Sequence, residues 1–391
     1  MRIGIVVDNT FDNDHRVQKE VRLLLNEGHE VKVLCFDFGM KYKSYNHFTV
    51  QRISINENLK NGLVILNTNF PFYNRFWAKY ISQFIKTEVL DALHVHDLYL
   101  SKPGRIAIEN SKINIPLTVD LHENYPAAIA SYRWATKGWR KYVVTPKKWF
   151  QKEENYLNYA DYIITLSNSF KQNLLKRFTS LKGNKIFVHP NMPDFESFQR
   201  FEDSIHTVNF KSEFPTLFYF GVVAKRRGII DILPWLNTLK QEGEQFHILI
   251  IGPIDKADVI EFERNKAQLG DSVTYVSWSD VKYLPAYLKK IDVGLAPFEV
   301  NPQHDSGVAN KLFQYMYGKV PMLATACKAQ KKLLETANCG LIYNDKEDFK
   351  SKLKQLLHSE SLREELGKNG RKELLRLYDR KVDREFLKIY N

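Results

Sequence analysis

Short apolar runs alternate with amphipathic stretches along the chain, and this alternation restricts the fold more than any other feature. Arg2–Val7 has the character of a buried strand, and residues 14–27 carry apolar side chains at helical spacing, ending at Gly28. Glu30–Phe36 has the character of a second strand. A helix between two strands joins them in parallel. The sequence therefore predicts an α/β protein built on parallel sheets.

The remaining strands fall into two series. In the first half they are expected at Ala92–His96, Ile115–Leu121, Tyr162–Leu166 and Lys185–His189. In the second half they are expected at Thr216–Phe220, His247–Gly252, Val273–Ser277, Val293–Pro297 and Pro321–Ala324. The polar segment 195–213 lacks periodicity and is expected to link the series. With 391 residues the chain is too long for one core, so we expect two Rossmann-like domains, 1–203 and 204–377. Charged helical patterns follow at Asp348–Leu377 and Asp379–Asn391.

The net charge of +12 indicates an acidic partner, either nucleotide phosphates, anionic lipid or nucleic acid. No nucleic-acid-binding motif is recognised, so we expect no nucleic acid partner. The three cysteines are widely spaced and form no metal-binding pattern. Because the first residues lack the features of a signal peptide and the apolar runs are too short to span a bilayer, we expect a cytoplasmic protein.

Polar residues follow four of the predicted strands. They are Asp8, the pair His96 and Asp97, the pair His122 and Glu123, and Ser167. In open α/β sheets ligands bind beyond the carboxyl ends of the strands. We therefore expect these side chains to lie where a site forms.

A predicted helix over Val308–Tyr317 offers a second candidate site. Its N-terminus would present free N–H groups to a phosphate, Lys311 in the first turn would add a charge, and Asp305 or Ser306 would cap it. The buried face is expected to carry Val308, Leu312, Tyr315 and Met316, and the opposite face Lys311, Gln314 and Gly318. An ordinary amphipathic helix ending at a glycine is the alternative reading of the same pattern.

The run Asn310–Pro321 resembles the signature NKLFEYMAxGKPV of family 4 retaining glycosyltransferases, which have the GT-B fold. Further similar segments are residues 12–34, 91–97, 160–167 and Tyr378–Tyr390. The resemblance implies two Rossmann-like domains facing each other across a cleft. The acceptor would bind to the N-terminal domain and a UDP- or GDP-sugar donor to the C-terminal domain. A C-terminal crossover helix, 378–391, would return to pack on the N-terminal domain.

The resemblance also implies residue roles on the acceptor side. His122 matches the family histidine near the reacting sugar, which is taken to hydrogen-bond the sugar and steady its developing positive charge. A loop histidine without a role is the alternative. The other residues expected on the acceptor side are Asn9, Asp14, His96, Asp97 and Glu123.

On the donor side, Tyr219–Gly228 is similar to the family pattern GRLxxxKG, and Arg227 falls at the lysine that binds the donor diphosphate. A solvated basic loop is the alternative. The residues expected to bind the donor are Arg227, Gly221, Arg226, Ser306, Asn310, Lys311 and Gln314. The residues expected to act in catalysis are His122, Arg227 and Asp305.

The sequence departs from the family pattern at three positions. Val222 replaces an arginine for which Arg226 could stand in, and Ser306 and Gln314 replace a pair of glutamates. Asp305 could partly substitute for the first glutamate, and a glutamine can still hydrogen-bond a ribose. These departures leave open a catalytically impaired homologue that binds nucleotide or glycan as a scaffold.

The resemblance implies no cofactor and no required metal, although Asp12-Asn13-Asp14 looks like a metal-binding triplet; we expect these residues to cap a helix. Two segments, Phe70–Lys86 and Tyr132–Lys152, mix aromatic and basic residues, as do segments that contact membranes. Core packing of the aromatic residues is the equal alternative. Lipid-linked acceptors are common in the family, which favours contact with the inner face of the cell membrane.

Overall fold

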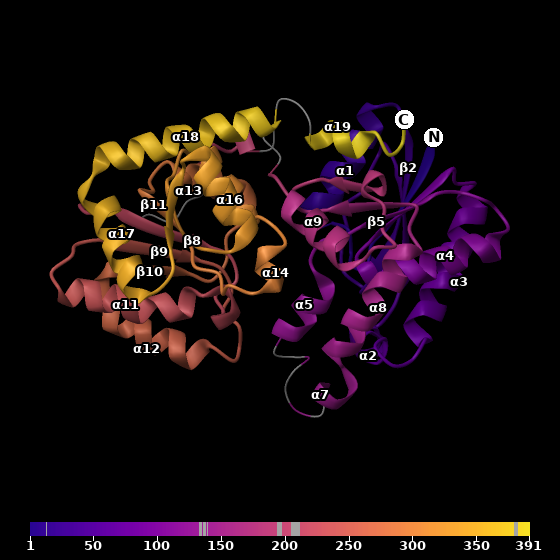
Figure 1. Cartoon of the computed structure of the whole chain (residues 1–391), viewed down its shortest axis with the longest axis horizontal. Helices are drawn as coiled ribbons and strands as arrows, with labels where there is room; N and C mark the ends of the chain where they lie inside the picture. The colour runs from indigo at the N-terminus through magenta and orange to yellow at the C-terminus, as the bar shows by residue number, and fades with distance from the viewer. Residues whose placement is uncertain are drawn as a thin grey trace. The chain divides into compact units, whose positions relative to one another are not determined.

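The computed structural model describes the whole chain except for a few residues, namely Asn13, Arg133, Trp134, Thr136, Lys137, Trp139 and the segments 194–197, 205–211 and 379–381. The chain forms two compact units (Figure 1). The first unit comprises Met1–Pro190 and Lys381–Asn391, and the second comprises Asn191–Arg380.

The boundary between the units lies after Pro190, whereas the sequence placed it after Asp203. Phe198 packs edge-on against Tyr317 with ring centroids 5.2 Å apart, and Phe201 against Tyr283 at 5.9 Å, both within the second unit. Because this stretch is mostly polar, sequence analysis did not identify Phe198 and Phe201 as the residues that attach it to the second unit. Most of the predicted linker, 195–213, lies outside the described residues.

The first unit is built on a seven-stranded sheet in the order β3-β2-β1-β4-β5-β6-β7, with every neighbouring pair parallel. The strands are β1 (Arg2–Val6), β2 (Glu30–Asp37), β3 (Thr49–Ser54), β4 (Ala92–His96), β5 (Leu117–Asp120), β6 (Tyr162–Thr165) and β7 (Ile186–Val188). The strand order reverses at β1, which has β2 on one side and β4 on the other. Sequence analysis missed β3, a half-exposed edge strand without a continuous apolar run.

Helices cover both faces of this sheet. They are α1 (His15–Asn26), α2 (Glu57–Leu66), α3 (Phe72–Glu88), α4 (Ser101–Ser111), α5 (Tyr125–Ser131), α7 (Arg140–Val143), α8 (Pro146–Asn158), α9 (Asn168–Arg177) and α19 (Val382–Leu387), with the 3₁₀ turns η1 (Leu98–Leu100) and η2 (Gly183–Lys185). One core contains Trp77 of α3 and Trp149 of α8, and the other contains Val17 of α1 and Phe386 of α19. Side chains alternate between these cores along each strand, as period-two geometry requires.

The second unit is built on a six-stranded parallel sheet in the order β10-β9-β8-β11-β12-β13. The strands are β8 (Thr216–Phe220), β9 (His247–Ile251), β10 (Val273–Val276), β11 (Val293–Ala296), β12 (Met322–Thr325) and β13 (Gly340–Tyr343). The helices are α11 (Ile229–Gln241), α12 (Val259–Leu269), α13 (Leu284–Leu288), α14 (Pro302–Asp305), α15 (Asn310–Tyr317), α16 (Lys328–Ala337), α17 (Lys346–His358) and α18 (Glu360–Tyr378), with the 3₁₀ turns η3 (Lys225–Arg227), η4 (Gly270–Ser272) and η5 (Val281–Tyr283).

Every strand predicted from the sequence is present, with small shifts at the ends, and the short edge strand β13 was missed. The helical pattern predicted over Asp348–Leu377 is confirmed, but it forms two helices. Ser359 is extended, with φ −124° and ψ 99°, and divides the segment into α17 and α18. The hydroxyl of Ser359 accepts the N–H of Leu362, so the residue caps the second helix.

The C-terminal segment belongs to the first unit, as expected for a crossover helix. Asp383 of α19 accepts from Lys19 Nζ at 2.9 Å and lies 3.1 Å from His189 Nε2. The hydroxyl of Tyr390 lies 2.7 Å from His94 Nδ1, and the tyrosine side chain is buried. Apolar and polar contacts together therefore hold this segment on the first unit.

Candidate active site

In the first unit, two neighbouring strands bring three of the predicted site residues together. The register of β4 and β5 pairs His96 with Asp120, so the residues that follow both strands emerge at the same edge of the sheet. His96 Nδ1 lies 2.8 Å from His122 Nε2. Asp97 follows directly, and its N–H donates to the Asp120 carbonyl at 2.7 Å. His122 retains an exposed side-chain fraction of 23%, so a ligand can reach it.

A buried ion network lies beneath these residues. Arg16 Nε and Nη2 donate to the two carboxylate oxygens of Asp120, at 2.7 and 2.8 Å, in the bidentate geometry that suits guanidinium and carboxylate. Arg16 also donates to the His189 carbonyl at 2.9 Å and lies 3.3 Å from Glu20. The Arg16 guanidinium, with hydrogen bonds from His122 and His96, outweighs burial and holds the pKa of the Asp120 carboxyl well below its usual range.

His122 is surrounded by carboxylates. Burial alone would lower the pKa of its imidazole, but Asp97, Asp120 and Asp14 outweigh burial and raise the pKa to about 10. An imidazolium donates from both nitrogens and accepts at neither. His122 is therefore a hydrogen-bond donor at neutral pH, suited to an oxygen acceptor such as a hydroxyl group.

Asp97 occupies strained backbone geometry, with φ 74° and ψ 146°. Residues other than glycine rarely adopt this conformation, which costs about 1–3 kcal/mol and occurs most often at functional sites. Burial raises the pKa of its carboxyl above the ordinary value. Strand pairing around the loop holds this conformation and fixes the carboxylate beside His122.

The loop after β1 positions the other acceptor-side candidates. Asn9 donates to Asp14 at 2.7 Å, and Asp14 caps α1 by accepting the N–H of Val17 at 3.1 Å, as predicted. Asp12 does not cap the helix; its carboxylate binds Arg52 at 2.8 Å instead. The remaining residue of the predicted triplet, Asn13, lies outside the described residues.

Glu123, the last of the acceptor-side candidates, accepts from the Tyr132 hydroxyl at 2.7 Å. This bond ties the loop after β5 to the end of α5. Glu123 is half-buried and stands beside His122 in the sequence, on the same loop.

Four buried side chains are grouped closely enough to suggest a metal site, namely Glu20, His94, His96 and Asp120, with ligand atoms within 4.8 Å of one another. The His94 and His96 rings stack at 4.5 Å with an interplanar angle of 16°. A metal binds imidazole nitrogen in the plane of the ring, so two nearly parallel rings direct their lone pairs side by side rather than at one point. Asp120 is also occupied by Arg16. The parallel rings and the occupied Asp120 both make the group a poor fit for a metal ion, although Glu20 Oε2, His94 Nε2 and His96 Nε2 have no hydrogen-bond partner within the described part of the chain.

In the second unit, a glycine-bounded loop follows β8. Gly221 ends the strand with φ 133°, and Arg226 and Arg227 lie in η3. Gly228 closes the turn with φ 75°, and a Cβ atom there would lie 1.4 Å from the Pro297 carbonyl oxygen. Only glycine fits at this position, so the loop carrying both arginines is held tightly against the end of β11.

Lys311 is the most unusual charged residue of the second unit. Its side chain is buried, with Nζ 3.5 Å from the centroid of the Tyr219 ring and 5.0 Å from that of Phe298. The Arg227 guanidinium lies 5.7 Å from the same Phe298 ring. Burial, and then repulsion from Arg227, hold the pKa of the Lys311 ammonium well below its usual range. Lys311 and Arg227 thus both lie near the Phe298 ring, and among the described residues no carboxylate forms an ion pair with Lys311.

The predicted start and faces of the helix near Lys311 need correction. Helix α15 begins at Asn310, after Ala309, and has no side-chain cap. Lys311 and Gln314 are buried although they were assigned to the outer face, because other elements pack around the whole helix. Gln314 therefore follows Lys311 by one turn inside the same environment, while Asn310 is exposed.

Asp305 and Ser306 lie at the end of α14 and make local contacts. The Asp305 carboxylate accepts the Lys328 N–H at 2.8 Å and lies 3.4 Å from its ammonium group, which anchors the start of α16. The Ser306 hydroxyl donates to the Pro302 carbonyl. The prediction that either residue caps α15 is wrong, because the chain turns at 307–309 before that helix begins.

The aromatic residues of the two aromatic-basic segments divide between core and surface. Tyr73, Trp77 and Trp149 are buried in the core, whereas Phe70 and Phe72 are each 48% exposed. Trp134 and Trp139 of the second segment lie outside the described residues. No helix in the described parts of the chain is both long and apolar enough to cross a membrane.

Sequence reasoning did not select Arg16, Glu20 or Asp120 as site residues. Arg16 stands within a segment that resembles the family, Asp120 lies two residues before His122, and a buried charge seldom occurs without a partner. That pairing could have been suspected, but a partner 104 residues away is fixed by strand order alone.

Comparison with known proteins places these features in a family. The model "Glycosyltransferase Family 4" matches residues 16–197, and "Glycosyl transferases group 1" matches residues 201–373. The capsular polysaccharide biosynthesis glycosyltransferase CapM of Staphylococcus aureus is 26% identical over 244 residues, which are 59% of this chain and 61% of CapM. The match therefore spans less than two thirds of this curated relative's length.

Solved structures agree on the fold. Sucrose-phosphate synthase from Thermosynechococcus elongatus superposes with a TM-score of 0.75 at 16% identity, covering 100% of this chain and 98% of that one. Anabaena HepE in complex with UDP gives 0.67 at 11% identity, with 100% and 98% coverage. The two matched models account for nearly the whole chain, and both sheets are parallel and flanked by helices. The chain belongs to the family 4 glycosyltransferases with the GT-B fold.

Proposed function

We propose that the protein transfers a sugar from a nucleotide diphosphate donor to a glycan or lipid-linked acceptor in the synthesis of a surface polysaccharide or glycolipid. The observation that carries the proposal is the buried ammonium of Lys311 beside Arg227, at the glycine-bounded loop after β8. Cations held in a low-dielectric environment are well suited to the charge that develops on a departing diphosphate. HepE, a structural relative, is described in complex with UDP, which supports a uridine nucleotide as the first donor to test.

The proposed reaction retains the configuration of the donor sugar. The bond between the sugar anomeric carbon and the diphosphate oxygen breaks, and the acceptor hydroxyl attacks from the face that the diphosphate leaves. The hydroxyl proton passes to a diphosphate oxygen, so charge and atoms balance without another reactant. Arg227, Arg226 and Lys311 stabilise the leaving group, with Gly221, Asn310 and Gln314 beside them, so the reaction requires no metal and no cofactor.

On the acceptor side we assign His122 to hydrogen-bond the sugar. Its raised pKa supports a role as donor to a sugar oxygen, and an imidazolium would not itself stabilise a positive sugar carbon. The surrounding carboxylates, among them Asp97, offset that charge. Asn9, Asp14, His96 and Glu123 hold the acceptor loops around it. We place the protein in the cytoplasm, at the inner face of the cell membrane.

The alternative, a scaffold that binds nucleotide or glycan without transfer, is favoured by the contacts of Asp305. Its carboxylate binds Lys328 and is not free to replace the missing family glutamate, and Ser306 bonds to Pro302. The two functions differ in one measurable step, because a scaffold would bind the nucleotide but release no diphosphate product.

The test is a transfer and hydrolysis assay with a panel of UDP- and GDP-sugars. Arg227→Ala and His122→Ala should each reduce turnover by about a hundredfold or more, while the folded state is retained. Full activity in both variants would refute the site assignment. Nucleotide binding without turnover for every donor would establish the scaffold function instead.

A further inference from the structure

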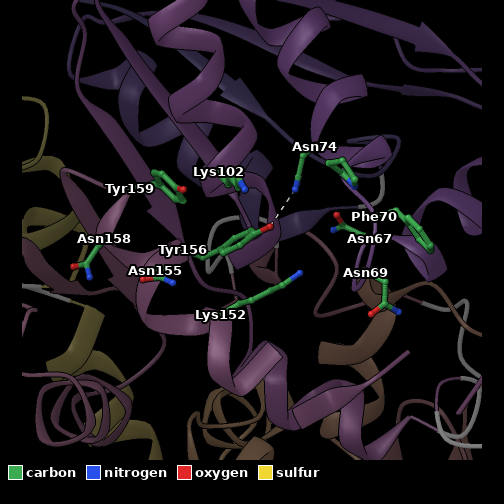
Figure 2. A pocket seen from close by; sticks show the side chains of 11 residues that line it. Asn67, Asn69, Phe70, Asn74, Lys102, Lys152, Asn155, Tyr156, Asn158 and Tyr159 are labelled. Carbon is green, nitrogen blue, oxygen red and sulfur yellow. Dashed lines mark hydrogen bonds between the residues drawn. The ribbon is translucent and has the colours of Figure 1, made fainter. Parts of the chain in front are cut away.

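A pocket of about 580 Å³ lies in the first unit, among α3, α4 and α8. Figure 2 shows its lining, with the polar ends of several side chains directed toward its interior. The lining combines five asparagines and two lysines with aromatic rings, namely Asn67, Asn69, Asn74, Asn155, Asn158, Lys102, Lys152, Phe70, Tyr156 and Tyr159, and with Pro71. A volume of this size suits a small ligand.

The pocket contains buried polar atoms without partners. Asn67 is only 2% exposed, and neither its Oδ1 nor its Nδ2 has a hydrogen-bond partner. Asn74 is 5% exposed; its Nδ2 donates to the Tyr156 hydroxyl at 3.1 Å, but its Oδ1 is unsatisfied. A buried polar group left without a partner costs about 1–3 kcal/mol, and a ligand toward which these amides rotate would remove that cost.

The pocket is also cationic. Lys152 donates to the Thr68 carbonyl at 2.7 Å, and an ammonium group has two further protons to offer. Burial, and then repulsion from Lys102 and Lys148, lower the pKa of Lys152. Among the described residues no carboxylate forms an ion pair with any of these three lysines. Their charge is therefore uncompensated within the part of the chain that the structure describes.

The lysine ammonium groups and the asparagine amides of the pocket together favour one class of ligand. Ammonium groups without carboxylate partners favour a phosphate, amides both donate to and accept from hydroxyl groups, and the half-exposed ring of Phe70 at the rim can lie against a sugar or polyol ring. We infer that this pocket binds a phosphate ester that carries several hydroxyl groups. Two sources supply such a group, a free sugar phosphate and the inositol phosphate headgroup of a membrane lipid.

The pocket is separate from the residues proposed for transfer. None of its lining residues belongs to the His122 loop or to the Lys311 environment. Its neighbours in the chain include Phe70 and Phe72, which stack at 5.7 Å with both rings half-exposed. Rings at the rim of a cationic pocket would enter the interfacial layer if the ligand is a headgroup. The inference does not depend on transferase activity.

The soluble arm of the test is isothermal titration calorimetry with glucose 6-phosphate and with inorganic phosphate. We expect one site for the ester and weaker binding of phosphate alone. Lys102→Gln and the isosteric Asn67→Asp should each lower affinity by about tenfold or more, because one removes a cation and the other adds an anion. Lys86→Gln, at the far end of α3, makes the same charge change and should have no effect.

The membrane arm is flotation with phosphatidylcholine vesicles, with and without phosphatidylinositol. Binding that requires phosphatidylinositol and is reduced in Lys102→Gln identifies a lipid headgroup, whereas binding of the soluble ester alone identifies a free sugar phosphate. Absence of binding in both arms would overturn the inference, as would binding that Lys102→Gln leaves intact but Lys311→Met removes. If Asn67→Asp does not fold, Lys102→Gln still decides the outcome.

Discussion

The ammonium group of Lys311 lies 3.5 Å from the centroid of the Tyr219 ring, on the face of a fully buried aromatic side chain. This contact joins α15 to β8, the two elements that carry the donor-side resemblance. The electrons of the ring face partly compensate a cation that has no ion-pair partner among the described residues. A cation kept in this way is available to an anionic ligand.

The first prediction concerns that cation. Lys311→Met keeps most of the side-chain volume but removes the charge, and nucleotide diphosphate affinity should fall by about tenfold to a hundredfold, as expected for a hydrogen bond to a charged group. Lys332→Met, at an exposed position of α16, is the matched control. Affinities of UDP and GDP from calorimetry give the comparison, and equal losses in both variants would contradict the assignment.

The same residue should make nucleotide binding depend on pH. Burial and Arg227 lower the pKa of Lys311 in the free protein, and a bound diphosphate would raise it again. Binding should therefore take up a proton, and affinity should fall as pH rises through the free-state pKa. Calorimetry in buffers of different ionisation enthalpy measures the proton uptake. Uptake that persists unchanged in Lys311→Met would assign it to another group.

The third prediction is a titration of His122. Its imidazole should titrate at a pH of about 10, and Asp97→Asn should lower this pKa by removing the strongest carboxylate contribution. Because the pKa of His122 is higher in the folded state than in the unfolded state, the protonated imidazole stabilises the folded state. This stabilisation is fully present below pH about 6.5 and disappears as pH rises through about 10. Imidazole resonances followed by NMR report the midpoint. A midpoint near 6.5 in the unmodified protein would show that the carboxylates do not control this group.

The fourth prediction concerns the buried pair of Arg16 and Asp120. Arg16→Met leaves a buried carboxylate without its partner, which should lower the free energy of unfolding by about 3–5 kcal/mol. Arg75→Met, at an exposed position of α3, should change it by less than about 0.5 kcal/mol. Urea unfolding at neutral pH measures both. A small effect of Arg16→Met would mean that Asp120 is stabilised by its histidine neighbours alone.

The fifth prediction concerns the attachment of the C-terminal helix. Burial opposes ionisation of Asp383, but His189 and Lys19 outweigh it and lower its pKa to about 2. The shift from 3.8 corresponds to about 2 kcal/mol of stability, which is present above pH about 4 and disappears as pH falls through about 2. Asp383→Asn should lose this amount at neutral pH and show a flatter decline in acid. An unchanged acid profile in urea would contradict the assignment.

Local sequence pattern was sufficient for most elements of the fold. The apolar runs located nearly every strand because a buried parallel strand is apolar on both faces. β3 and β13 were missed because an edge strand buries less of its surface and needs no such run. Ser359 was missed as a break because the charged pattern continues across it, whereas the cap depends on one hydroxyl and one N–H.

The sequence by itself determined the α/β class, the two parallel sheets and the family, since strand periodicity, glycine positions and the Asn310–Pro321 signature are all local. Tertiary structure decided which charges are buried and with what partners. Asp120 meets Arg16 because β4 and β5 lie side by side near α1, and Lys311 is buried because Tyr219 and Phe298 close over it. Contacts between distant segments depend on strand order, and no local pattern of residues encodes that order.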